Sequence, residues 1–313
     1  MALKIKNPVI EQRADPHVYL HHDGYYYFTA SVPEYDRIEL RRAKTLAGLA
    51  ETHEIVTVWH KPDHGPYSEL IWAPEIHAID GSWYIYFAAA PSREIKDGLF
   101  QHRMYAIGCH GENPLTEPWT FCGPIDSGID SFCLDATTFA HRGTRYYVWA
   151  QKEPTIAGNS NLYIAEMLSP TTLKLPASRL SIPEFDWEVQ GFMVNEGPYI
   201  LIRHGKVWLT YSASATDERY CMGLLQADEN ADLLDPASWH KSPNPVFVTN
   251  ADKHVFGPGH SCFTKDEQGH DILVYHARDY TEIDGDPLWD PNRHTRMKPV
   301  VWDGDQLVLG QAE

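Results

Sequence analysis

Five short stretches of the chain share one pattern: a polar turn that carries glycine, followed by a run of aromatic and β-branched residues. The clearest copies are residues 23–31 (DGYYYFTAS) and 80–88 (DGSWYIYFA). Apolar runs of this length and composition predict buried strands, and the glycine supplies the positive φ that a tight hairpin turn needs. The related stretches are 142–150, 204–212 and, more weakly, 268–276.

The turn glycines recur at a nearly constant interval. They lie 57, 62, 62 and 64 residues apart along the chain. A repeat of this length has room for three or four strands, which is typical of one propeller blade. The spacing therefore predicts an all-β fold, a single five-bladed β-propeller. Its blades start near residues 15, 75, 135, 196 and 260, and one domain covers residues 1–313. An ordinary β-sandwich with glycines spaced by chance is the alternative.

Composition narrows the range of partners. The 313 residues carry a formal net charge of −17, which repels phosphate backbones and anionic lipid. No run of about 18 apolar residues appears in the sequence, so we expect no membrane span. Aromatic residues make up 12% of the chain and offer flat apolar surface. We therefore expect neither nucleic acid nor membrane as a partner. The oligomeric state stays open.

Three observations predict a cytoplasmic location. The five cysteines are an odd number without a CxxC pair, which is typical of free thiols rather than a disulfide framework. Residues 1–8 contain no apolar core of signal-peptide length. No Asn-x-Ser/Thr glycosylation site occurs.

An ionisable residue precedes each turn glycine by six to nine positions. These residues are Asp15, Glu75, Asp135, Glu196 and His260. The first strand of a propeller blade lines the central channel, so we expect all five side chains to meet at one mouth of it. Crowded carboxylates raise at least one pKa, and a pair with one protonated and one ionised member is what glycoside hydrolysis requires. Taken singly, each residue could be a strand-start cap, since Asp before Pro is a common turn signal.

Three motifs carry a resemblance to a known family. They are residues 14–16 (ADP), 134–136 (LDA) and 196–198 (EGP). With them the chain resembles glycoside hydrolase family 43, the five-bladed propellers that include α-L-arabinofuranosidases, arabinanases and β-xylosidases, from about residue 7 to 309. The resemblance implies an inverting hydrolase with its active site at one mouth of the channel. Asp15 would be the general base, Glu196 the general acid, and Asp135 the residue that tunes the pKa of Glu196 and orients it.

The resemblance also implies residues that bind the sugar. His260 matches the axial histidine of the family, which in several relatives helps to hold calcium or a water cluster. We therefore expect no required cofactor, with calcium or another ion possible near His260. An arginine of the segment 293–302 would reach the sugar hydroxyls, with Arg296 preferred over Arg293. The predicted substrate-binding residues are Trp72, Glu75, Phe132, His260, Arg293 and Arg296.

Residues 65–75 and 276–296 are similar to the branch with exo-acting α-L-arabinofuranosidases. We therefore expect release of terminal α-L-arabinofuranose from arabino-oligosaccharides, without an accessory carbohydrate-binding module. A β-xylosidase or endo-arabinanase on the same scaffold is the main alternative. A fructan-hydrolysing propeller is more remote, because its WMNDPNG-type opening is missing. A non-catalytic sugar-binding propeller is the alternative from another class.

Overall fold

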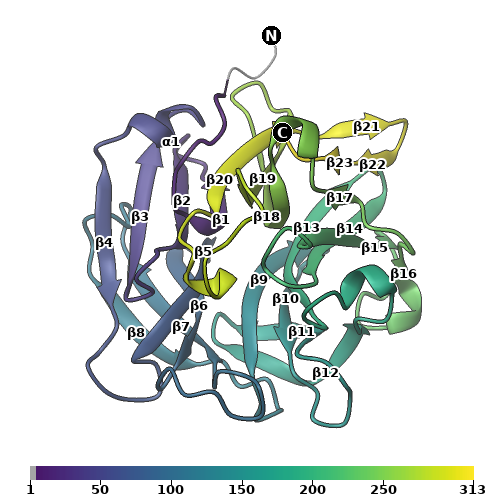
Figure 1. Ribbon diagram of the computed structural model, residues 1–313. Coiled ribbons are helices and arrows are strands. Elements are labelled where there is room, and N and C mark those ends of the chain that lie inside the picture. The colour runs from purple at the N-terminus through teal and green to yellow at the C-terminus, as the bar shows by residue number, and fades with distance from the viewer. Residues whose placement is uncertain (1–4) are drawn as a thin grey trace.

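Five β-sheets are arranged around a central channel in the computed structural model, which describes residues 5–313 (Figure 1). The predicted five-bladed β-propeller is confirmed. In each blade the strand nearest the channel comes first in the sequence and pairs antiparallel with the next. These inner strands are β1 (Ala14–Leu20), β5 (Glu69–Ile79), β9 (Cys133–His141), β13 (Asn195–Arg203) and β18 (Phe256–Lys265).

The outer strands complete each sheet. Blade one adds β2 (Tyr26–Ser31), β3 (Arg37–Ala43) and β4 (Ile55–His60), and blade two adds β6 (Ser82–Ala90), β7 (Arg103–His110) and β8 (Trp119–Pro124). Blade three adds β10 (Thr144–Gln151), β11 (Asn161–Ser169) and β12 (Thr172–Ser181). Blade four adds β14 (Lys206–Ala213), β15 (Cys221–Asp228), β16 (His240–Lys241), β17 (Phe247–Val248) and β23 (Gly310–Gln311). Blade five adds β19 (Asp271–Arg278) and β20 (His294–Pro299), and a separate hairpin joins β21 (Val301–Asp303) to β22 (Gln306–Val308).

Helical structure is scarce in the described part of the chain. It comprises α1 (Gly48–Glu51) and the 3₁₀ turns η1 (Asp186–Glu188), η2 (Pro236–Ser238), η3 (Ala251–Lys253) and η4 (Pro287–Trp289). Within residues 5–313, no helix has the length and apolar character to cross a membrane.

The two ends of the chain close the ring of blades. The amide of Val9 donates to the carbonyl of Thr295 on β20 at 2.8 Å, and the amide of Thr295 donates to Ile10 at 2.9 Å. These bonds join the segment before blade one to blade five. At the other end, β23 adds to β17 as a parallel strand of blade four. Residues far apart in sequence thereby hold the circle together.

All five inner strands share a one-residue bulge, where the register against the second strand shifts, and β5 and β18 carry a second bulge closer to their starts. In the shared bulge the extra residue adopts the left-handed backbone conformation, with φ between 43° and 54°. A bulge bends its strand and re-aims a side chain, and bulges are common beside active sites. The five bulged residues are Asp15, Ala73, Asp135, Gly197 and His260.

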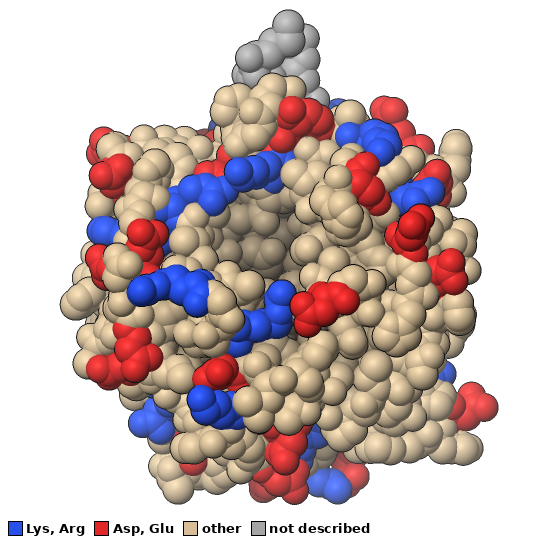
Figure 2. Space-filling model, turned by 180° about the vertical axis from the view of Figure 1, so that it is seen from behind, with Lys and Arg blue, Asp and Glu red and all other residues tan. Residues whose placement is uncertain are grey.

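The two faces of the molecule differ because the inner strands all run in the same direction along the channel. The bulges lie at one end, whereas a second opening at the other end is lined by Tyr19, Phe139, Tyr199 and Phe263. Figure 2 shows the molecule from behind, with a hollow near its centre and basic side chains at the border of that hollow.

Candidate active site

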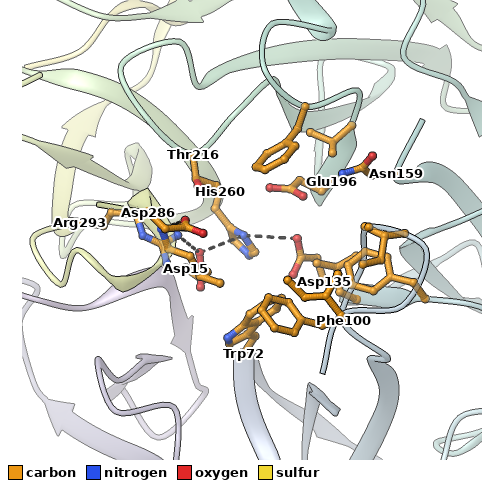
Figure 3. A pocket seen from close by; sticks show the side chains of 18 residues that line it. Asp15, Trp72, Phe100, Asp135, Asn159, Glu196, Thr216, His260, Asp286 and Arg293 are labelled. Atoms are coloured by element: carbon orange, nitrogen blue, oxygen red, sulfur yellow. Dashed lines mark hydrogen bonds and ion pairs between the residues drawn. The ribbon is translucent and has the colours of Figure 1, made fainter. Parts of the chain in front are cut away.

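The bulged ends of the inner strands surround a cavity of about 190 Å³ (Figure 3). This is smaller than the roughly 300–1,000 Å³ of pockets for drug-sized ligands, and it suits a single small sugar. Seven of the nine site residues predicted from the sequence line it: Asp15, Trp72, Phe132, Asp135, Glu196, His260 and Arg293.

Asp15 is held on several sides. Its Oδ2 accepts a hydrogen bond from the Ser31 hydroxyl at 2.6 Å, and its Oδ1 lies 3.3 Å from Nδ1 of His260 and 3.4 Å from Nη1 of Arg293. Burial raises the pKa of Asp15, but His260, Arg293 and His276 together outweigh burial and hold it well below its ordinary value. Because the arginine keeps its charge at every relevant pH, Asp15 is an ionised carboxylate.

Glu196 has the opposite character. Burial raises the pKa of Glu196 to about 7, and the negative charge of Asp15 adds to this, while a hydrogen bond from Tyr220 acts against it. The Tyr220 hydroxyl donates to Oε1 of Glu196 at 2.8 Å. Glu196 therefore keeps its proton up to about neutral pH.

Asp135 lies on the other side of His260 from Asp15. Its Oδ2 accepts the backbone N–H of Gly197 at 3.1 Å and lies 3.7 Å from Nδ1 of His260. Burial raises the pKa of Asp135 well above its ordinary value, and the charges of Glu196 and Asp15 raise it further. Figure 3 shows Asp15, His260 and Asp135 in a row across the cavity.

The structure brings only one of the two candidate arginines to the cavity. Arg293 is 6% exposed and lies against Asp15 and the Tyr35 hydroxyl, to which its Nη2 donates at 3.1 Å. Arg296, which the sequence analysis preferred, does not line the cavity; it pairs with Asp279 and the carbonyl of Glu313. An odd separation along extended backbone places two side chains on opposite faces, which separates residues 293 and 296.

Glu75 is also absent from the cavity, contrary to the prediction. The bulge of blade two falls at Ala73, so Glu75 lies two residues further along the channel. There its Oε2 lies 3.0 Å from Nε2 of His77 and 3.7 Å from Nε2 of His17. Burial raises the pKa of Glu75. Glu75 thus belongs to a buried polar cluster beneath the site.

The residue types in this cluster are ones that bind metal ions, but the protonation state of His17 does not suit a metal. His17, Glu75 and His77 place ligand atoms within 4.8 Å of one another. Nδ1 of His17, however, accepts the backbone N–H of Ile76 at 3.3 Å, so the proton of the neutral ring is on Nε2, the nitrogen that faces Glu75. A protonated nitrogen has no lone pair for a metal.

The surroundings of His260 fit calcium poorly. Calcium takes six to eight oxygen ligands. The carboxylates nearest to Nδ1 of His260 are Asp15 and Asp135, and the guanidinium of Arg293 lies against the same Asp15 oxygen. A fixed positive charge beside a ligand oxygen disfavours a divalent cation. The ion near His260 stays a prediction, as does the expectation that no cofactor is required.

Aromatic rings form one wall of the cavity. Trp72 stacks on His102 with ring centroids 3.8 Å apart, and Phe132 meets His102 edge-on at 5.8 Å. Phe100 packs edge-on against Trp72 at 5.7 Å. Phe100 was not predicted, because it comes from the long β6–β7 loop, which lies outside the repeated pattern.

Two further residues escaped the sequence analysis. Tyr220 precedes β15 and His276 lies on β19, so neither is on an inner strand. Both approach the carboxyl groups across neighbouring strands: Tyr220 donates to Glu196, and Nδ1 of His276 accepts the backbone N–H of Asp15 at 3.0 Å. A periodic pattern along one strand carries no signal for such contacts.

A family model for glycosyl hydrolases family 43 matches residues 5–308. The chain belongs to this family. The resemblance drawn from the three acidic motifs is thereby confirmed. Similar proteins include an extracellular exo-α-(1→5)-L-arabinofuranosidase of Streptomyces avermitilis, 52% identical over 96% of this chain and 61% of the relative. One of the same name from Streptomyces chartreusis is 50% identical over 90% of this chain and 85% of the relative.

A solved structure of an α-L-arabinofuranosidase from Lactobacillus brevis is also similar to this family 43 chain. It is 55% identical and superposes with a TM-score of 0.98, covering 100% of this chain and 98% of the other. Against the Streptomyces avermitilis enzyme, in contrast, the chain spans only about 61% of the relative's length.

The prediction of a cytoplasmic location is contradicted, because both Streptomyces relatives are named extracellular enzymes. The features behind that prediction are indirect. Unpaired cysteines and missing glycosylation sites report on disulfide and sugar chemistry, and a protein can be secreted without either.

Proposed function

We propose that this family 43 protein is an inverting exo-α-L-arabinofuranosidase that removes terminal arabinofuranose from α-1,5-linked arabino-oligosaccharides. The observation that carries the proposal is the pair of carboxyl groups in one small cavity, with the pKa of Asp15 lowered and that of Glu196 raised to about 7. The names of the Streptomyces and Lactobacillus relatives support the choice of arabinofuranose.

Each carboxyl group has a distinct role in the proposed reaction. Asp15, kept ionised by Arg293, removes a proton from the attacking water. Glu196, kept protonated by burial, gives its proton to the oxygen of the departing sugar. Asp135 is the third acid: its Oδ2 accepts the Gly197 amide and so fixes the backbone next to Glu196, and the charges of Asp135 and Glu196 act on each other.

The rim of the cavity favours attack at a chain end. Leu288 lines the cavity, and its carbonyl accepts the Tyr35 hydroxyl at 2.8 Å, while Arg278 donates to the carbonyl of Pro287 at 2.7 Å. These bonds fix the η4 segment of blade five against blade one. A fixed rim around a cavity of sugar size admits one terminal unit rather than the middle of a polymer.

The test follows the first product by NMR with linear α-1,5-arabino-oligosaccharides and xylo-oligosaccharides in parallel. Free β-arabinose appearing before mutarotation is the expected result, because inversion converts an α linkage to a β product. Xylose alone would move the proposal to a β-xylosidase, and longer arabinose fragments would move it to an endo-acting enzyme. Binding without turnover of either sugar would overturn the enzymatic proposal.

A further inference from the structure

Tyr220 occupies a central position among the acidic groups, although it comes from outside the inner strands. Its ring is 2% exposed, and its hydroxyl donates to Oε1 of Glu196 at 2.8 Å. Among residues 5–313, no other group donates a hydrogen bond to the Glu196 side chain. The orientation of the Glu196 carboxyl group therefore depends on Tyr220.

The ring of Tyr220 is fixed by its neighbours. It lies parallel to the ring of His276, with centroids 5.6 Å apart and an interplanar angle of 6°. On another side it occupies the space beside Gly259, where an added Cβ would lie 2.3 Å from Cε1 of Tyr220. A phenol held on two sides has one position for its hydroxyl.

The direction of the hydrogen bond is fixed as well. The backbone N–H of His260 donates to Oγ of Ser212 at 2.8 Å, so the Ser212 hydroxyl directs its own proton elsewhere. Burial raises the pKa of Tyr220 well above its ordinary value, and the charges of Glu196 and Asp135 raise it further. Tyr220 therefore stays a neutral phenol and donates its proton toward Glu196.

The same stack also reaches Asp15. His276 is 1% exposed, and its Nδ1 accepts the backbone N–H of Asp15 at 3.0 Å. The stacked rings thus contact both groups: Tyr220 binds the side chain of Glu196, and His276 binds the backbone of Asp15. This arrangement fixes the spacing of the two groups that must act on opposite sides of the sugar.

We propose that Tyr220 is a positioning residue that occupies Oε1 of Glu196, so that Oε2 carries the proton given to the leaving oxygen. This inference rests on the proposed function, in which Glu196 is the general acid. The bond from Tyr220 stabilises the ionised carboxylate more than the neutral acid, so it also limits how far the pKa of Glu196 rises.

The test compares the pH dependence of kcat/KM for the wild-type protein and Tyr220→Phe on an arabino-oligosaccharide. In the variant the alkaline limb moves upward by about one pH unit, because the bond that favoured ionisation is lost. The rate at the optimum falls about tenfold, because the carboxyl group is free to turn. On an aryl arabinofuranoside with an acidic phenol leaving group, the rate falls less.

Tyr211→Phe is the matched control. Tyr211 is also fully buried and donates to a buried glutamate, Oε1 of Glu188, at 2.8 Å, but neither residue lines the cavity. This variant loses the same kind of bond and leaves the alkaline limb in place. An equal displacement in both variants would show a general structural effect and overturn the proposal, as would an unmoved limb in Tyr220→Phe.

A second substitution tests the proposal if Tyr220→Phe folds poorly. Incorporation of 3-fluorotyrosine at position 220 keeps the shape of the ring and strengthens its hydroxyl as a donor, so the alkaline limb moves downward instead. Movement in the other direction, or none, contradicts the inference. A wild-type protein without hydrolytic activity would instead refute the proposed function, so the two failures are distinguishable.

Discussion

The starts of blades one and four use the same backbone device for opposite chemistry. Blade one places Asp15 on the left-handed residue of its bulge, where Arg293 and His260 keep it ionised. Blade four places Gly197 on that residue, and its acid, Glu196, comes one position earlier. There Glu196 meets a neutral phenol in place of a cation, and burial keeps it protonated.

The difference shows that position in the repeat does not determine protonation. Both acids lie at the same end of equivalent strands and line the same cavity. Their pKa values diverge because the charged partners arrive from one side only: Arg293 follows the η4 segment and reaches blade one. The repeat supplies the carboxyl groups, and the loops that are not repeated assign their roles.

The largest expected effect follows from removal of the base. Asp15→Asn lowers kcat/KM about 10⁴-fold on both arabino-oligosaccharides and aryl arabinofuranosides, because water must be deprotonated with either leaving group. Asp266→Asn is the control, since Asp266 is a buried aspartate that pairs with His270 outside the cavity. Activity of Asp15→Asn within tenfold of the wild type would remove Asp15 as the base.

Removal of the acid separates the two substrates. Glu196→Gln lowers kcat/KM about 10³-fold on an arabino-oligosaccharide, where the leaving sugar needs a proton. On a dinitrophenyl arabinofuranoside the loss stays under about tenfold, because that leaving group departs as an anion. Steady-state rates on both substrates provide the check. Equal losses on the two substrates would contradict the role of Glu196 as the acid, and with it the contrast between blades one and four.

The two arginines give a smaller contrast. Arg293→Met lowers kcat/KM about 10²-fold, because a charged partner of the base is lost. Arg296→Met changes kcat/KM less than about threefold, because Arg296 lies outside the cavity and pairs with Asp279 and the carbonyl of Glu313. Kinetics of both variants at one pH test this prediction. A larger loss in Arg296→Met would restore the original preference for that residue.

The smallest effect concerns stability at Glu75. Its pKa is raised in the folded protein, so its stabilising contribution is complete below the unfolded value near 4.5 and is lost as pH rises. Glu75→Gln removes that loss and can still accept from His77. We expect a Tm about 2 °C above the wild type at pH 8 and no gain at pH 4. A gain at pH 4 alone would contradict the burial of an ionisable group here.

Much of the fold and the three acidic residues that line the cavity could be predicted from the sequence. The glycine turns are local signals, and their interval revealed the blades. Glu75 was misplaced because positions were counted back from those turns, although the bulge shifts the register. The prolines give a better alignment: Asp15-Pro16, Ala73-Pro74 and Gly197-Pro198 place the bulged residue directly.

What could not be predicted depends on contacts between blades. Tyr220 and His276 have no distinctive neighbours in the sequence, and their importance comes from the residues that face them across strands. The sequence does not distinguish Arg293 from Arg296, whose side chains leave the extended backbone on opposite sides. Such distinctions follow from register, which a single bulge can invert.

The bulged backbone has a consequence for engineering the protein. A left-handed conformation costs a residue other than glycine roughly 1–2 kcal/mol, and blade four avoids this cost with Gly197. Asp15, Asp135 and His260 bear it. Glycine at these three positions would relieve the strain, yet each exchange removes a side chain from the cavity. A search for more stable variants would therefore select against the active site at these three strained positions.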